Sequence, residues 1–218
     1  MKIAVGVPTM NNFKGLAELL ASLWGDEFTP FIVNNWTINN GVSKAWNTLL
    51  LETVDVYDLL VVCNDDITWH GSSFQTLVEG WDDRPDDAIM ITGANSPMVD
   101  HGFSRSPDYS CFMIDPKQYI KVVGLFDENF TPAYFEDNDS HYRIRLSGYE
   151  AYAYNGATIT HKGSQTQNAD LNNPVVPASM FERNRSYYIE KWGGQPGEEK
   201  YRNPYGDTTK DWKYWRDC

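Results

Sequence analysis

The sequence predicts an α/β fold in which helices flank a mainly parallel central sheet, a Rossmann-like arrangement. In the first two thirds of the chain, short runs of strand-forming residues alternate with helical patterns of apolar residues, an alternation typical of layered α/β domains. The run Leu59–Cys63 is continuously apolar, as in a strand buried on both faces of a parallel sheet. The chain has 218 residues, 41% of them hydrophobic, which is enough for one substantial core.

The predicted elements begin with a strand over Lys2–Val7. A helix follows, with Asn11 or Asn12 available to cap its first turn, and its apolar residues have the spacing of a single stripe: Leu16, Leu19, Leu20 and Leu23. We expect the second strand over Phe31–Val33 and a helix after Gly41. The residues on the apolar face of that helix are Val42, Ala45, Trp46, Leu49 and Leu50.

The remaining elements follow the same logic. Strands are expected at Leu59–Cys63, Ala88–Thr92, Cys111–Ile114 and Ala157–Thr160. Helices are expected over Ser73–Trp81, after Pro116, after Glu136 and over Ser179–Trp192. Residues 193–218 combine glycine, proline, charges and aromatic rings without a period, so we expect an extended tail that packs on the domain, with partial disorder as the alternative.

The charge and cysteine content limit the function classes. Eighteen basic residues stand against thirty acidic ones, a formal charge of −12, which disfavours general binding to nucleic acids or anionic membranes. Cys63, Cys111 and Cys218 have no paired spacing, so a reducing, cytoplasmic environment is expected. From the N-terminal residues and the hydropathy we expect neither a signal peptide nor a membrane-spanning run, and no glycine-rich loop of the GxGxxG or Walker type occurs.

Two groups of carboxylates are candidates for chemistry. Asp65 and Asp66 follow a buried strand, where α/β sheets bind ligands, and a divalent cation held there would neutralise a diphosphate. Asn-Asp-Asp is equally a good turn sequence. Glu136, Asp137 and Asp139 begin a helix after an aromatic segment, where desolvation would tune a general base. The alternative is that these acidic residues only stabilise the helix, because negative charges in the first turn interact favourably with the helix dipole.

Histidines and aromatic residues offer weaker candidates. His161 follows an apolar strand and precedes a flexible loop, so it either completes a metal site with Asp66 or caps the strand. His70, His101 and His141 have no partner pattern and are expected at the surface. The tail rings Trp212, Tyr214 and Trp215, together with Trp192, either stack on a sugar or anchor the tail, and we favour anchoring.

Five segments then stand in a characteristic order: Val5–Asn11, Asn39–Asn47, Val61–Ile67, Val123–Tyr149 and Thr160–Ser164. They contain Pro-Thr-Met-Asn, Asn-Asn-Gly with Ala-Trp-Asn, Asn-Asp-Asp, Gly-Leu-Phe-Asp-Glu with Glu-Asp-Asn-Asp and Arg, and His-Lys-Gly-Ser. Together they resemble the family 2 glycosyltransferases, enzymes of the GT-A fold that move a sugar from a nucleotide diphosphate to an acceptor. The likeness extends over about residues 2–165.

The resemblance implies a role for each matching residue. Asp66 and His161 would hold Mn²⁺ or Mg²⁺, Asp137 would be the general base of an inverting transfer, and Glu136 would help to position the acceptor. The nucleotide, expected to be UDP, would contact a polar set: Pro8, Thr9, Asn11, Asn34, Asn35, Asn47, Asn64 and Asp65. Residues 1–100 would bind the nucleotide sugar and metal, and residues 101–192 would form the acceptor side.

The sequence also departs from the family pattern. Asn34 and Asn35 stand where members usually carry Asp for the base, and Asn64 replaces the first Asp of the metal motif. Beyond the core, Arg183–Arg185, Tyr188 and Lys191–Gly194 lie on the expected acceptor side. Two rival functions stay open: a metal-dependent nucleotidyltransferase, and a catalytically silent carbohydrate-binding protein. The acceptor, a glycan or another hydroxyl compound, is not specified.

Overall fold

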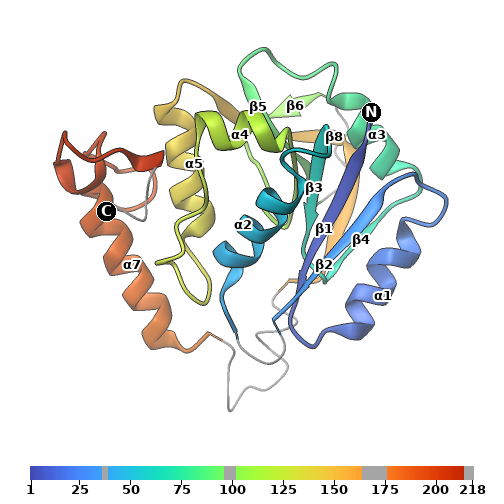
Figure 1. Ribbon diagram of the computed structural model, residues 1–218, viewed down its shortest axis with the longest axis horizontal. Coiled ribbons are helices and arrows are strands. Elements are labelled where there is room, and N and C mark those ends of the chain that lie inside the picture. The colour runs from blue at the N-terminus through green and yellow to red at the C-terminus, as the bar shows by residue number, and fades with distance from the viewer. Residues whose placement is uncertain (36–38, 96–101, 164–175, 214–218) are drawn as a thin grey trace.

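In the part of the chain that the structure describes, eight strands form one sheet in the order β2-β1-β3-β7-β5-β8-β4, with β6 paired to β8 (Figure 1). The computed structural model describes residues 1–35, 39–95, 102–163 and 176–213. The strands are β1 Ile3–Thr9, β2 Thr29–Asn34, β3 Leu59–Cys63, β4 Ile67–Trp69, β5 Ala88–Ala94, β6 Phe103–Ser104, β7 Cys111–Ile114 and β8 Glu150–His161. The helices are α1 Phe13–Ser22, α2 Val42–Thr53, α3 Ser73–Gly80, α4 Pro116–Val122, α5 Glu136–Leu146 and α7 Ala178–Trp192, with a 3₁₀ turn at Pro204–Gly206.

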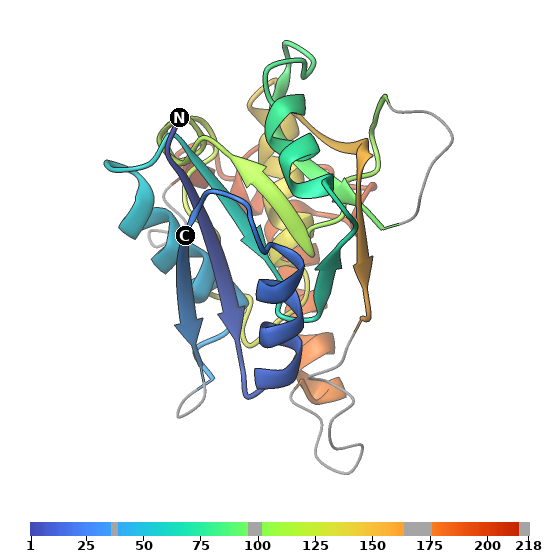
Figure 2. The ribbon, with the colours of Figure 1, turned by 90° about the vertical axis from the view of Figure 1, so that its right-hand side faces the viewer.

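The core of the sheet is mostly parallel. β1 pairs in parallel with both β2 and β3, and β5 pairs in parallel with β8; Figure 2 shows β1 and β2 side by side with the same direction. β7 lies between β3 and β5 and is antiparallel to both. The strands β1, β2, β3, β5 and β8 therefore all point the same way, and their carboxyl ends meet at one edge of the sheet.

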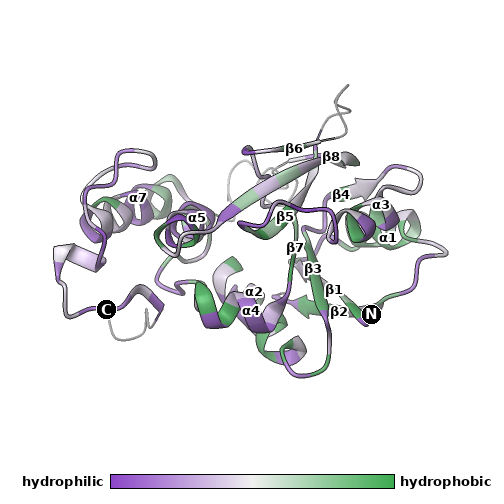
Figure 3. Ribbon diagram, turned by 90° about the horizontal axis from the view of Figure 1, so that it is seen from above, coloured by the Kyte–Doolittle hydropathy of each residue, from purple (hydrophilic) through white to green (hydrophobic). Residues whose placement is uncertain are grey.

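Helices cover both faces of this sheet. In Figure 3, α1 and α3 lie on one side of the strands and α2 and α4 on the other. Side chains alternate across a strand, so Val5 and Val61 join one buried cluster with α1 and α3, while Leu60 and Val62 join the other with α2 and α4. This three-layer arrangement matches the fold class that the sequence predicts.

Local sequence explains where two of the described helices begin. The Asn12 side chain accepts a hydrogen bond from the Gly15 amide and caps α1. Asp115 likewise accepts from the Gln118 amide before α4. The predicted strand Ala157–Thr160 is part of the longer β8. The strands β4 and β6 are not predicted, because a strand of two or three residues is too short to show an alternating pattern.

The helix α7 and the described part of the tail form the side of the molecule opposite α1 (Figure 1). Phe130, Tyr188 and Trp192 make a third, smaller apolar cluster there. The amides of Lys200 and Tyr201 donate to the Trp192 carbonyl, at 2.9 and 3.0 Å. Thus the tail folds back onto the end of α7.

Candidate functional site

A cleft of about 350 Å³ opens at the edge of the sheet where the parallel strands end. Its walls come from the ends of β1 and β8, from residues that follow β2 and β3, from the start of α2, and from the segments 108–110 and 132–137. Nine of the twelve sequence-predicted site residues line it: Pro8, Thr9, Asn35, Asn64, Asp65, Asp66, Glu136, Asp137 and His161. The fold thus brings together residues that are up to 153 positions apart, from Pro8 to His161.

The two adjacent aspartates on one wall have different partners. Asp65 accepts hydrogen bonds from Thr9 Oγ1 at 2.6 Å and from Asn12 Nδ2 at 3.1 Å, which tie the end of β3 to β1 and α1. Burial raises the pKa of Asp65, against the lowering by these hydrogen bonds. The Asp66 carboxylate instead lies 3.2 Å from His161 Nε2. Asp66 is therefore the aspartate that is paired with an imidazole in the cleft.

The β4–β8 ladder places His161 beside Asp66. Ile67 is directly opposite His161 in the antiparallel register, and the Lys162 amide donates to the Asp66 carbonyl at 3.0 Å. The hydrogen bond to Asp66 raises the pKa of His161, while burial lowers it. An imidazolium–carboxylate pair and a pair of metal ligands are both compatible with this geometry.

The first turn of α5 also lines the cleft. Glu136 is buried, and its Oε2 has no hydrogen-bond partner among the described residues. Burial, reinforced by the neighbouring Asp137 charge, raises the pKa of Glu136 well above its usual value. Burial also raises the pKa of Asp137, although the Asn138 amide donates to its Oδ1 at 2.8 Å. Both carboxyls are therefore shifted toward the range in which a group exchanges protons near neutral pH.

A strained turn presents these carboxyls. Tyr134 and Phe135 both have φ of 76°, in the left-handed region that costs a side chain energy. The Asn184 side chain on α7 donates to the carbonyls of Ala133 and Tyr134, at 2.8 and 3.2 Å. Since Asn184 is fully buried, α7 holds this turn in place.

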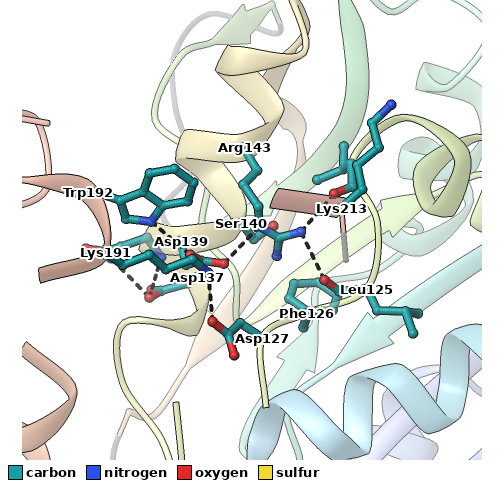
Figure 4. Close-up of polar contacts among 12 residues, drawn as sticks. Leu125, Phe126, Asp127, Asp137, Asp139, Ser140, Arg143, Lys191, Trp192 and Lys213 are labelled. Atoms are coloured by element: carbon teal, nitrogen blue, oxygen red, sulfur yellow. Dashed lines mark hydrogen bonds and ion pairs between the residues drawn. The ribbon is translucent and has the colours of Figure 1, made fainter. Parts of the chain in front are cut away.

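Behind the cleft, a buried network of charges joins α5 to α7 (Figure 4). Lys191 Nζ lies 2.7 Å from Asp127 Oδ2 and 2.8 Å from Asp139 Oδ1. Arg143 Nε donates to Asp139 Oδ2 at 2.8 Å, and Trp192 Nε1 donates to Asp139 Oδ1 at 2.9 Å. Burial would raise the pKa of Asp139, but the Lys191 and Arg143 charges hold it below its usual value.

Comparison with known proteins bears on this architecture. No family model matches the chain. The catalytic domain of Drosophila β1,4-galactosyltransferase 7 superposes with a TM-score of 0.58 at 15% identity, over 84% of this chain and 79% of that one. GalNAc-T7 superposes with a TM-score of 0.62 at 13% identity, over 100% of this chain and 54% of that one. The chain has the GT-A fold.

One curated protein is similar to part of this chain in sequence. A galactofuranosyl glycosyltransferase of Leishmania donovani is 33% identical over 113 residues. The match covers 43% of this chain and 24% of that protein, so the chain spans about a quarter of the relative's length. Among the described residues, no helix is long and apolar enough to cross a membrane.

Three of the residues predicted to contact the nucleotide do not line the cleft. The Asn47 amide is buried and fully used: it donates to the Phe126 carbonyl and Glu128 Oε1, both at 2.9 Å, and accepts from the Phe126 amide. In this structure the Asn47 side chain joins α2 to the segment before α5. Asn11 and Asn34 are exposed at the ends of their elements and do not line the cleft.

The structure also places the residues expected beyond the core. Lys191 and Trp192 are fully buried and hold α7 to α5, which agrees with the structural role that the sequence favours for Trp192 over stacking on a sugar. Arg183 donates to the carbonyls of Asn129 and Thr131. His141, predicted at the surface, is partly buried, with Nε2 3.5 Å from Glu150 Oε1. The predictions for Ser164, His101, Tyr214, Trp215 and Cys218 lie outside the described residues.

Sequence reasoning missed part of the lining. Asp108, Tyr109 and Ser110 precede β7 and lie at the cleft because that strand is antiparallel to its neighbours. No local pattern marks this reversal. Among the residues that the structure describes, no group of three or more His, Cys, Asp or Glu side chains is arranged to hold a metal ion.

Proposed function

We propose that this protein is a glycosyltransferase that moves a hexosyl group from a nucleotide diphosphate, UDP in the first instance, to an acceptor hydroxyl with inversion and with the help of Mn²⁺ or Mg²⁺. The observation that carries the proposal is that one cleft is lined both by Asp66 and His161, which are 3.2 Å apart, and by the buried carboxyls of Glu136 and Asp137. The GT-A fold and the relative from Leishmania support sugar transfer in general.

The residues present suit a divalent cation. A carboxylate oxygen of Asp66 and Nε2 of His161, 3.2 Å apart at two strand ends, form the mixed oxygen and nitrogen ligand set that Mn²⁺ accepts, and phosphate oxygens commonly complete such sites. The GalNAc-T7 structure contains UDP, GalNAc and Mn²⁺, and a mutant of the Drosophila enzyme was crystallised with manganese, UDP-Gal and xylobiose. When bound, the cation would offset the charge that develops on the departing diphosphate.

Asp137 would act on the acceptor. Its carboxylate takes the proton from the acceptor hydroxyl, while that oxygen attacks the anomeric carbon and the bond from this carbon to the diphosphate oxygen breaks. A single displacement of this kind inverts the anomeric configuration. The raised pKa of Asp137 makes it a stronger base than an exposed aspartate, and buried Glu136 beside it would help to position the acceptor.

Residues 1–100 would then hold the nucleotide sugar. Thr9, Asn35 and Asn64 line the donor side of the cleft. The Asn35 amide both donates and accepts hydrogen bonds, as the edge of a uracil base requires. Residues 101–192 would form the acceptor side.

Calorimetric titration tests the donor site before any acceptor is known. UDP, GDP, dTDP and CDP are titrated into the protein with and without Mn²⁺, and we expect metal-dependent binding of UDP. Asp66→Ala should abolish the effect of Mn²⁺, because it removes a proposed metal ligand. Asp83→Ala is the control, since it removes an exposed carboxylate that does not line the cleft. Failure of all four diphosphates to bind would overturn the proposal.

A second variant tests the proposed base. Asp137→Asn should still bind UDP with Mn²⁺, because the nucleotide side is untouched. Transfer from the UDP-sugar that the wild type uses should fall by about a hundredfold or more, the usual contribution of a general base. Full transfer activity in Asp137→Asn would exclude this residue as the base.

A further inference from the structure

A second pocket of about 280 Å³ adjoins the first cleft. We call it the α5 pocket; its walls are one face of α5, the segment 105–109, Tyr188 of α7 and the tail residues 196–199. Asp137 and Tyr109 line both cavities. The proposed base therefore lies between the cleft proposed to bind the nucleotide and a separate cavity that has no assigned function.

The face of α5 that lines this pocket has a regular spacing. Asp137, His141 and Arg145 follow one another at intervals of four residues, so their side chains stack along one side of the helix. Eight residues of an α-helix rise about 12 Å. The pocket thus runs from the proposed base to an arginine at a distance comparable to the length of a disaccharide.

Most charged groups of the pocket already have partners. Glu199 accepts from the Tyr188 hydroxyl and from the Gly197 amide. Arg105 lies 3.6 Å from Asp87 and 3.8 Å from Glu150.

Arg145 differs from these groups. It is exposed, and no hydrogen bond or ion pair of its guanidinium is present in the described part of the chain. Arg145 is therefore a cation at the far end of the pocket that no carboxylate of the described residues pairs with, while Glu199, held by two neutral donors, keeps its negative charge in the wall formed by the tail.

Aromatic side chains complete the walls. Tyr109 and Tyr142, both partly exposed, line the pocket, and the hydroxyl of Tyr142 is held by the Tyr201 carbonyl at 2.9 Å. Tyr188 also belongs to the lining, but its ring is fully buried. Fixed rings beside polar groups suit a sugar, which has apolar C–H faces and a rim of hydroxyls.

We propose that the α5 pocket is the acceptor site and that it takes an acidic carbohydrate, with a hydroxyl at Asp137 and a carboxylate or phosphate at Arg145. Guanidinium groups bind both anions through paired N–H donors. The assignment rests on the proposed function, because that function makes Asp137 the group that receives the hydroxyl proton.

An oligosaccharide array tests the assignment with defined probes. Neutral, uronate-bearing, sialylated and phosphorylated oligosaccharides are printed, and the protein is applied with UDP and Mn²⁺. We expect retention on acidic members and a loss of about tenfold in their affinity for Arg145→Ala, the usual effect of removing a charged hydrogen bond. Lys117→Ala removes an exposed cation outside both cavities and should bind like the wild type.

Each result distinguishes this inference from the proposed function. Equal retention of neutral and acidic members, acidic binding that survives Arg145→Ala, or no retention at all would overturn the acceptor assignment, while metal-dependent UDP binding would leave the transferase proposal standing. Loss of UDP binding together with Arg145-dependent retention would support an acidic-glycan site and overturn the transferase proposal. The carboxylate and phosphate members separately identify which anion the pocket prefers.

Discussion

Substitution of Lys191 tests whether the buried charges join α7 to the rest of the domain. In Lys191→Met, an apolar chain of similar length replaces a fully buried ammonium group. Asp139 keeps its contact with Arg143 at 2.8 Å. Asp127 loses its only cation among the described ion pairs and keeps the Tyr187 hydroxyl at 2.8 Å. A carboxylate is thus left buried without an ion-paired cation.

The expected loss follows from that geometry. Removing one partner of a buried ion pair destabilises a protein by about 3–5 kcal/mol, a large part of the total stability of about 5–15 kcal/mol typical of a domain. The comparison is Glu182→Ala, which removes the exposed pair with Arg185 at 3.6 Å. Exposed pairs contribute about 0–1 kcal/mol, so this control should unfold nearly like the wild type.

Urea unfolding followed by tryptophan fluorescence measures both variants. Adding Asp127→Asn to Lys191→Met should recover part of the lost stability, because the uncompensated carboxylate becomes neutral. If Lys191→Met unfolds within about 1 kcal/mol of the wild type, or the second substitution recovers nothing, the reasoning from buried charge is refuted.

Three further outcomes can be measured in the same way. Burial raises the pKa of Glu136 above its unfolded value, so the contribution of this proton to stability is full below about pH 4 and is lost as pH rises through the folded pKa. Glu136→Gln should flatten that decline in urea unfolding over a pH series, and an unchanged decline would contradict it. Asn184→Leu leaves two backbone carbonyls before α5 without their donor and should cost about 1–3 kcal/mol; a loss below about 0.5 kcal/mol would show that the strained turn holds without it. Gly124→Ala and Gly148→Ala both place a side chain at positive φ, but only the first meets backbone, 2.7 Å from the Lys213 carbonyl. Gly124→Ala should therefore cost more stability and expose the tail to limited proteolysis, and equal behaviour of the two variants would argue against tail contact at Gly124.

The sequence alone predicts features that depend on neighbouring residues. Three such features are the apolar stripe of α1, the cap at Asn12 and the buried run of β3. Each involves residues only a few positions apart, so the local sequence pattern predicts it directly. Polar residues after β1, β2 and β3 could also be placed at one edge, because parallel strands end together. These patterns are enough for the α/β class and for the polar residues that the ends of β1, β2 and β3 bring to the cleft.

Only the tertiary structure decides which partner each of two similar side chains contacts. Asp65 and Asp66 are adjacent and chemically alike, yet Thr9, 56 positions away, holds the first, while the β4–β8 register places His161 beside the second. Lys191 looks like a surface residue of a helix, yet Asp127, 64 positions away, pairs with it in the core. Contacts between residues so far apart in the sequence depend on how the layers pack, and no periodic pattern in the local sequence predicts that packing.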